Sequence, residues 1–155
     1  YIFYLEIPYF QSRKKSIAMD HKFHISLPCR HIDATEKFYT QIIGASCGRK
    51  SQNWVDINLF GHQMTFSKSG TFKFTYPSYS FEKTVLPSFH YGIILPNENW
   101  KKLYKKMKAE DFLHIDETKF LAGKPGEHKS FFLRDPNGYI IEFKCFKNPE
   151  SAFES

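Results

Sequence analysis

The sequence predicts an α+β protein in which two paired βαβββ modules form a curved mixed sheet around a cleft. Two internal repeats indicate this fold. The segment FHISL at residues 23–27 returns as FHYGI at 89–93, an offset of 66, and GHQMTF at 61–66 returns as GYIIEF at 138–143, an offset of 77. The same succession of strand and helix patterns also follows each copy of the first segment. Repeats of this kind are typical of a duplicated supersecondary unit.

The first module begins with an expected strand at residues 22–27, which Pro28 ends. A helix follows, with Asp33 as its expected N-cap and Glu36 at capping-box spacing. Gly44 ends this helix, because glycine is a favoured residue just after a helix. Three short strands are expected next, at about 46–49, 54–59 and 63–67. The first half therefore has the order strand, helix and three strands.

Residues 68–87 are a polar and aromatic connector, of a length that fits a functional loop or a linker between modules. The second module then repeats the order, with a strand at 89–95 and a helix capped by Asn97. The apolar stripe of this helix has the spacing i, i+3, i+4 and i+7: Trp100, Leu103, Tyr104 and Met107. Strands are expected at 112–120, 128–133 and 139–146. The last two flank the turn DPNG, since Asn-Gly tolerates positive φ.

The expected domain covers both modules, at about 21–67 and 88–147, because neither half has enough apolar residues for a core of its own. Residues 1–20 are interpreted as an N-terminal extension or the remnant of a cloning tag, and 148–155 as a C-terminal tail. The segment EIPYFQS at 6–12 resembles a protease recognition pattern used to remove tags.

The composition of the chain limits the classes of partner that it is expected to bind. The formal charge is +6, but many lysines lie on one expected helix face, and no basic stripe interleaves with aromatic residues, so nucleic acid is not an expected partner. An anionic small substrate explains the charge equally well. No apolar run approaches the roughly 20 residues that span a bilayer. Three cysteines without CxxC spacing indicate a reduced, cytoplasmic setting.

The repeats also indicate which residues could form a metal site in the cleft. Residues of one parity on a strand share a face, so if His24 faces the cleft, His90 faces it too. The second repeat makes Thr65 equivalent to Glu142. Two imidazoles and a carboxylate form a metal-ligand set that suits Fe(II), with Mn, Zn, Ni or Co as other choices. A carboxylate in the apolar run around Glu142 must be paired, metal-bound or protonated, and Lys144 is the alternative partner.

Two further histidines are candidates for proton transfer, because imidazole titrates near neutral pH. His62 follows a turn and could reach the mouth of the cleft, and His128 begins a strand. His31 and His114 are interpreted as ordinary surface or helix-entry residues.

These features resemble the vicinal oxygen chelate superfamily, which groups glyoxalases, bleomycin and fosfomycin resistance proteins and extradiol dioxygenases. The resemblance covers about residues 21–147, and rests on both repeats, on the helix end FY…IG at 38–44 and on FLRDPNG at 132–138. It implies paired βαβββ modules around a metal-binding cleft, with His24, His90 and Glu142 as the ligands. It also implies a homodimer.

The resemblance further implies a metal-dependent enzyme whose small substrate, anionic or aromatic, chelates the metal through adjacent oxygens. Glyoxalases add a fourth ligand where this chain has Thr65, so the three-ligand set is closer to dioxygenases. Those enzymes tend to carry a tyrosine where this chain has Phe132. Two alternatives stay open: a metal-free drug-sequestering protein of the bleomycin resistance type, and a lyase or thiol transferase of the fosfomycin resistance type.

Overall fold

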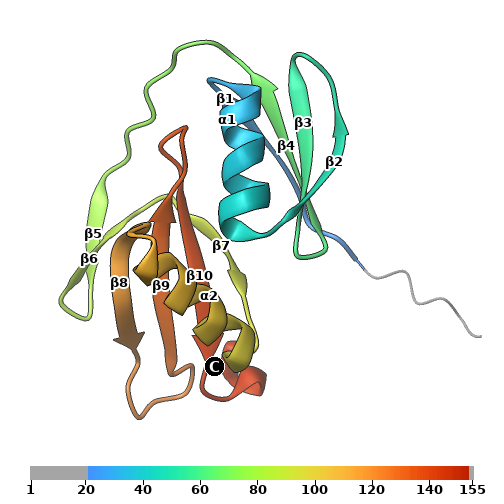
Figure 1. The fold of residues 1–155 in the computed structure, drawn as a ribbon. Helices are drawn as coiled ribbons and strands as arrows, with labels where there is room; N and C mark the ends of the chain where they lie inside the picture. The colour runs from blue at the N-terminus through green and yellow to red at the C-terminus, as the bar shows by residue number, and fades with distance from the viewer. Residues whose placement is uncertain (1–20, 154–155) are drawn as a thin grey trace, which may run out of the picture.

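The computed structural model describes residues 21–153, and the expected extension at 1–20 lies outside this range. Figure 1 shows two βαβββ modules joined by a long connector. The elements of the first module are β1 (His24–Cys29), α1 (Ile32–Lys37), η1 (Phe38–Ile43), β2 (Ser46–Lys50), β3 (Trp54–Leu59) and β4 (His62–Lys68). Those of the second are β7 (Tyr91–Ile94), α2 (Asn97–Ala109), β8 (Leu113–Phe120), β9 (His128–Arg134) and β10 (Ile140–Phe146), followed by the short helix η2 (Pro149–Phe153).

Each module forms its own four-stranded mixed sheet, with the orders β1-β4-β3-β2 and β7-β10-β9-β8. In both sheets the first strand runs parallel to the last. Ser26 stands opposite Thr65 in one sheet, and Gly92 stands opposite Glu142 in the other. These pairs reproduce the offsets of 66 and 77, so the predicted duplication and the predicted fold class are confirmed.

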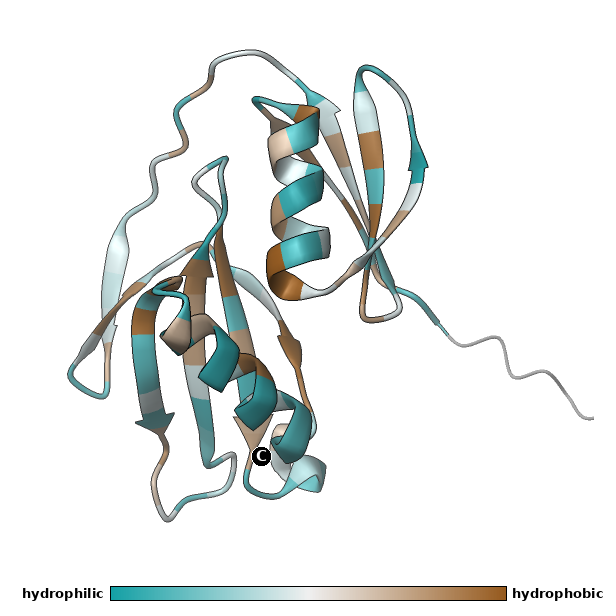
Figure 2. Cartoon of the chain, viewed as in Figure 1, coloured by the Kyte–Doolittle hydropathy of each residue, from teal (hydrophilic) through white to brown (hydrophobic). Residues whose placement is uncertain are grey.

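One face of each sheet packs against the helix of its own module, and alternation along the strands decides which residues face that helix. In Figure 2 hydrophobic and hydrophilic positions alternate along the strands, and the exposed side of α2 is hydrophilic. The helix-side residues of both modules join one hydrophobic core. Its largest members include Tyr39 and Phe66 from the first module, and Trp100, Phe131 and Phe143 from the second. The opposite face of each sheet is called its open face below.

The helix α1–η1 lies between the first sheet and the second module (Figure 1). The hydroxyl of Tyr39, on η1, is hydrogen-bonded to the hydroxyl of Tyr91 and donates to Asp135 at 3.3 Å. The backbone N–H of Arg30 donates to Asn137 Oδ1 at 2.9 Å. The modules therefore meet through the helix-covered side of the first sheet, and the DPNG turn takes part in the contact.

Both helix starts differ from the prediction. The N-cap of α1 is His31 and not Asp33, which instead lies in the first turn, where the helix dipole favours a negative charge. The N-cap of α2 is Pro96 and not Asn97: the extended ψ of 148° at Pro96 places this residue just outside the helix, which begins at Asn97. None of the helices within residues 21–153 is long and apolar enough to cross a membrane.

The connector contains a hairpin that the sequence analysis did not predict, formed by β5 (Ser78–Phe81) and β6 (Thr84–Pro87). Its turn residues, Glu82 and Lys83, adopt φ values of 46° and 69°. Such turns usually carry glycine or asparagine, so the usual sequence signal is missing. The hairpin covers part of the second sheet's open face, where residues from both pack together: Phe81, Leu86, Ile115, Phe120, Phe132 and Ile140.

Candidate functional site

The second module brings His90 and Glu142 together on its open face. Glu142 lies in the middle of β10, is 8% exposed, and has its Oε2 atom 3.5 Å from Nε2 of His90. On the other side of the ring, Nδ1 of His90 lies 3.0 Å from the carbonyl oxygen of Pro87. A carbonyl only accepts hydrogen bonds, so Nδ1 carries a proton, and Nε2 is the ring nitrogen that faces the carboxylate.

Two more side chains hold the Glu142 carboxylate. The hydroxyl of Ser130, fully buried on β9, donates to Oε1 at 2.6 Å. The ammonium of Lys144, the alternative partner considered from the sequence, lies 3.3 Å from Oε2. Glu142 and Lys144 are two residues apart on β10, so both project from the open face. This carboxylate is thus oriented by a hydroxyl at one oxygen and shared by two nitrogen groups at the other.

A cavity of about 320 Å³ opens beside this pair. The sheet and the hairpin line it together: Tyr79, Phe81, Leu86, His90, Phe120, His128, Glu142 and Lys144. Phe132, directly opposite Glu142 in the strand register, meets the His90 ring edge-on at 5.7 Å. The cavity therefore combines a polar floor with apolar walls, as ligand sites commonly do.

His128 is the predicted proton-transfer residue that lines this cavity. Its Nδ1 faces the carbonyl oxygen of Gly126 at 2.7 Å, which leaves Nε2 as the unprotonated nitrogen of the neutral ring. Burial lowers the pKa of His128, although the Gly126 hydrogen bond acts in the opposite direction. The imidazole is therefore neutral at pH 7 and able to accept a proton.

His24 lies elsewhere. It is exposed on the open face of the first sheet, on β1, and α1–η1 separates that sheet from the second module (Figure 1). Within residues 21–153, no three His, Cys, Asp or Glu side chains form a group that could hold a metal ion. One chain thus assembles His90 with Glu142 but does not add His24 to them. The three-ligand set stays a prediction.

The open face of the first sheet has its own polar network. Thr65, the equivalent of Glu142, donates its hydroxyl to Asp56 Oδ1 at 2.6 Å, and Arg49 and Gln63 donate to Oδ2. Burial would raise the pKa of Asp56, but these hydrogen bonds outweigh it and hold the pKa below its ordinary value. His62 lines a cavity of about 350 Å³ beside this network, apart from the cavity of His90.

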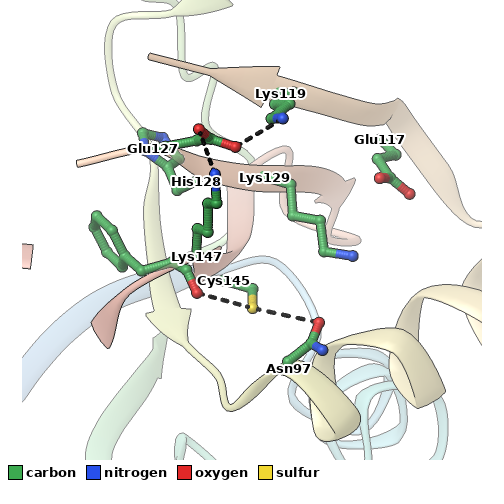
Figure 3. A pocket seen from close by; sticks show the side chains of 9 residues that line it. Asn97, Glu117, Lys119, Glu127, His128, Lys129, Cys145 and Lys147 are labelled. Atoms are coloured by element: carbon green, nitrogen blue, oxygen red, sulfur yellow. Dashed lines mark hydrogen bonds and ion pairs between the residues drawn. The ribbon is translucent and has the colours of Figure 1, made fainter. Parts of the chain in front are cut away.

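A further cavity of about 370 Å³ opens at the end of the second sheet, near the start of α2 (Figure 3). Its lysines already have partners. Lys119 and Lys147 lie 2.7 and 3.3 Å from the Glu127 carboxylate, and Lys129 lies over the Trp100 ring at 4.0 Å. The hydrogen bonds from Lys119 and from the backbone N–H of Gly123 lower the pKa of Glu127 to about 2. Because its lysines are already held by these partners, we interpret this region as structural and not as a ligand site.

Comparison with known proteins decides the family. Residues 23–143 match the family model of the Glyoxalase/Bleomycin resistance protein/Dioxygenase superfamily. The chain belongs to this superfamily. The match confirms the resemblance predicted from the repeats. No curated protein sequence matches the chain.

Solved structures of the superfamily share the fold. A glyoxalase/bleomycin resistance protein/dioxygenase from Alicyclobacillus acidocaldarius is 24% identical with a TM-score of 0.73, over 86% of this chain and 97% of that one. The fosfomycin resistance protein FosX from Listeria monocytogenes is 15% identical with a TM-score of 0.60, over 87% and 99%. A lactoylglutathione lyase from Agrobacterium tumefaciens is 14% identical with a TM-score of 0.56, over 81% and 92%. At these identities the likeness supports the fold alone.

The hairpin residues of the cavity and Ser130 were not among the residues predicted from the sequence of this superfamily member. The hairpin gave no turn signal. Ser130 did leave a signal, because it is a polar residue at the start of the buried run FFL, on the same strand face as Phe132. Asp56 was missed as well, although it interrupts the apolar residues of β3 as a buried charge.

Proposed function

We propose that this chain is the subunit of a metal-dependent enzyme, dioxygenase-like or lyase-like, that acts on a small substrate with adjacent oxygens. The observation that carries the proposal is the pair of His90 and Glu142 beside the 320 Å³ cavity. Nε2 of His90 and the carboxylate of Glu142 are both ligand types for divalent metal ions, and they lie 3.5 Å apart beside the cavity. A divalent metal ion at this place would take both as ligands.

The residues present fit such an ion. A metal-binding histidine usually donates its other ring N–H to a carbonyl or carboxylate, as His90 does to Pro87, and a ligating carboxylate is usually hydrogen-bonded, as Glu142 is to Ser130. Mixed imidazole and carboxylate donors suit Fe(II) first, and Mn, Zn, Ni or Co as well. The bound ion would polarise oxygens of the substrate as a Lewis acid.

We propose that His24 of a second copy completes the ligand set. His24 lies on β1 and His90 directly precedes β7, and these strands stand at equivalent outer positions of their sheets. Among the described residues, neither β1 nor β7 has a strand on its outer side. Phe23 and Ile94, beside these edges, are 58% and 55% exposed. A homodimer in which β1 of one copy lies along β7 of the other would cover this apolar surface and bring His24 to the cavity.

The chain's own residues would move the proton. Neutral His128 lines the cavity and can accept a proton from the substrate. Phe132, at the position where dioxygenases of the superfamily tend to carry a tyrosine, offers no hydroxyl for this task. His62 could take part only if the second copy brings the first sheet to the cavity. All three cysteines are free thiols, which supports a reducing, cytoplasmic setting.

Elemental analysis of purified protein tests the proposal. We expect about one divalent metal ion per chain, lost in His90→Ala because one of few ligands is removed. His114→Ala is the matched control, since His114 is exposed on β8 and does not line the cavity. Unchanged metal content in His90→Ala, or no metal in the wild type after reconstitution, would contradict the proposal. Oxygen uptake with catechol as the substrate then separates dioxygenase from lyase chemistry.

A second candidate is a metal-free protein that binds small molecules. The ammonium of Lys144 at 3.3 Å from Glu142 favours it, because this cation can already neutralise the carboxylate. The two candidates differ in their response to a chelator. Ligand-induced thermal stabilisation that survives excess chelator would support the metal-free candidate.

A further inference from the structure

We propose that Lys144 binds an anionic oxygen of the substrate, and that the substrate is a small organic anion with an apolar body, such as an aromatic carboxylate. The proposal rests on the proposed metal-dependent function. It adds a specificity residue and a substrate class to that site.

The position of Lys144 is the first argument. Its side chain is 27% exposed, so the ammonium lies at the cavity and not free in solvent. Among the described residues that line the cavity, Lys144 is the one lysine or arginine. An anionic group that enters the cavity therefore has one lysine ammonium as its positively charged partner.

The balance of charge is the second argument. Without metal, the ammonium of Lys144 and the carboxylate of Glu142 neutralise each other at 3.3 Å. A divalent ion on Glu142 would compete with Lys144 for the same oxygen and leave the cavity with an excess of positive charge. Charges in a partly buried site repel each other strongly unless an opposite charge joins them. An anionic ligand with one oxygen at Lys144 removes this excess.

The walls of the cavity supply the third argument. Phe81 and Leu86 from the hairpin and Phe120 from β8 form the apolar side of the cavity. Leu86 and Phe120 are 4% and 1% exposed, so these walls are packed in place. An apolar body fits against them, because carbon surface gains free energy when it leaves water. The cavity therefore selects a ligand that is anionic at one end and apolar at the other.

Binding titrations with defined probes test this inference. The probes are Mn²⁺ alone, benzoate, and its neutral counterpart benzamide, each titrated calorimetrically into the purified full-length chain. Lys144→Met removes the charge and keeps much of the side-chain length, and Lys144→Arg keeps the charge. Lys147→Met is the matched control, because Lys147 is ion-paired with Glu127 in another cavity.

Two opposite shifts are expected in Lys144→Met. Mn²⁺ should bind about tenfold more tightly, because a competing cation is gone. Benzoate should bind the Mn²⁺-loaded protein at least about tenfold more weakly, because a charge-assisted hydrogen bond is lost. Benzamide affinity should not change. Lys144→Arg should retain benzoate binding, and Lys147→Met should match the wild type.

The outcomes separate this inference from the proposed function. If benzoate binds Lys144→Met as tightly as the wild type, or if the wild type does not prefer benzoate to benzamide, the role of Lys144 is overturned while metal binding stands. If the wild type binds no Mn²⁺ but benzoate binding still depends on Lys144, the metal-dependent function is overturned and the anion site stands. Failure of both probes overturns both proposals.

Discussion

At the scale of single residues, the candidate site depends on how one carboxylate is held. Glu142 projects from a strand whose neighbours are apolar, and a bare carboxylate there would be strongly disfavoured. Ser130, Lys144 and His90 surround its two oxygens. Of these, the buried Ser130 contacts Oε1, so it orients the carboxylate without occupying the oxygen that faces His90.

Because Ser130 donates a hydrogen bond to Glu142, we expect its loss to weaken metal binding. Ser130→Ala should weaken metal affinity by about 10- to 100-fold, because partners that orient a ligating carboxylate commonly have effects of this size. Titration with Mn²⁺ measures the change. Ser46→Ala, at an exposed position on β2, is the control and should not differ from the wild type. Equal affinity in Ser130→Ala and wild type would show that the hydroxyl does not position the ligand.

At the scale of elements, the β5–β6 hairpin covers part of the second sheet's open face and forms one wall of the 320 Å³ cavity. It has no counterpart within the first module, whose open face stays polar around Asp56 and Thr65. Its tip is held in place, since the Glu82 carboxylate accepts a hydrogen bond from the N–H of Leu121 at 2.6 Å. The two modules share a fold, but the hairpin gives them different surfaces.

The packing of Leu86 tests whether the hairpin is a stable wall. Leu86→Ala should lower the free energy of unfolding by about 2 to 5 kcal/mol, because it leaves a void among Phe120, Phe132 and Ile140. Urea denaturation measures the change. The neighbouring Val85 is 66% exposed, so Val85→Ala should have little effect. Similar stability for both variants would mean that the hairpin is not packed on the sheet.

At the scale of the whole molecule, the way the modules meet decides which surfaces remain for a partner. Contacts such as the bond between Tyr39 and Tyr91 bury the helix-covered side of the first sheet. His24 is left exposed on the opposite side. We therefore expect a site that uses both His24 and His90 to form between two chains.

Complementation between variants tests this arrangement. Neither His24→Ala nor His90→Ala alone should bind metal, but a purified mixed dimer of the two should hold about one metal ion, because one of its two sites keeps every ligand. Elemental analysis of the mixed dimer, with separate affinity tags on the two chains, gives the count. A mixed dimer without metal would show that the ligands do not come from two chains.

The duplicated βαβββ fold can be predicted from the sequence, and so can the equivalence of His24 with His90 and of Thr65 with Glu142. This is possible because strand register and side-chain parity are local properties, preserved when a unit is repeated. The DPNG turn and the apolar stripe of the second helix are also local, because each depends on the preferences of residues close together in the chain.

The surroundings of Glu142 and the cavity wall become visible only in the folded chain. The contact between Ser130 and Glu142 joins two strands, and the hairpin forms with no glycine or asparagine in its turn. The separation of His24 from His90 follows from the packing of α1–η1 between the first sheet and the second module. These features depend on contacts between residues far apart in the chain, which a periodic pattern within one segment does not encode.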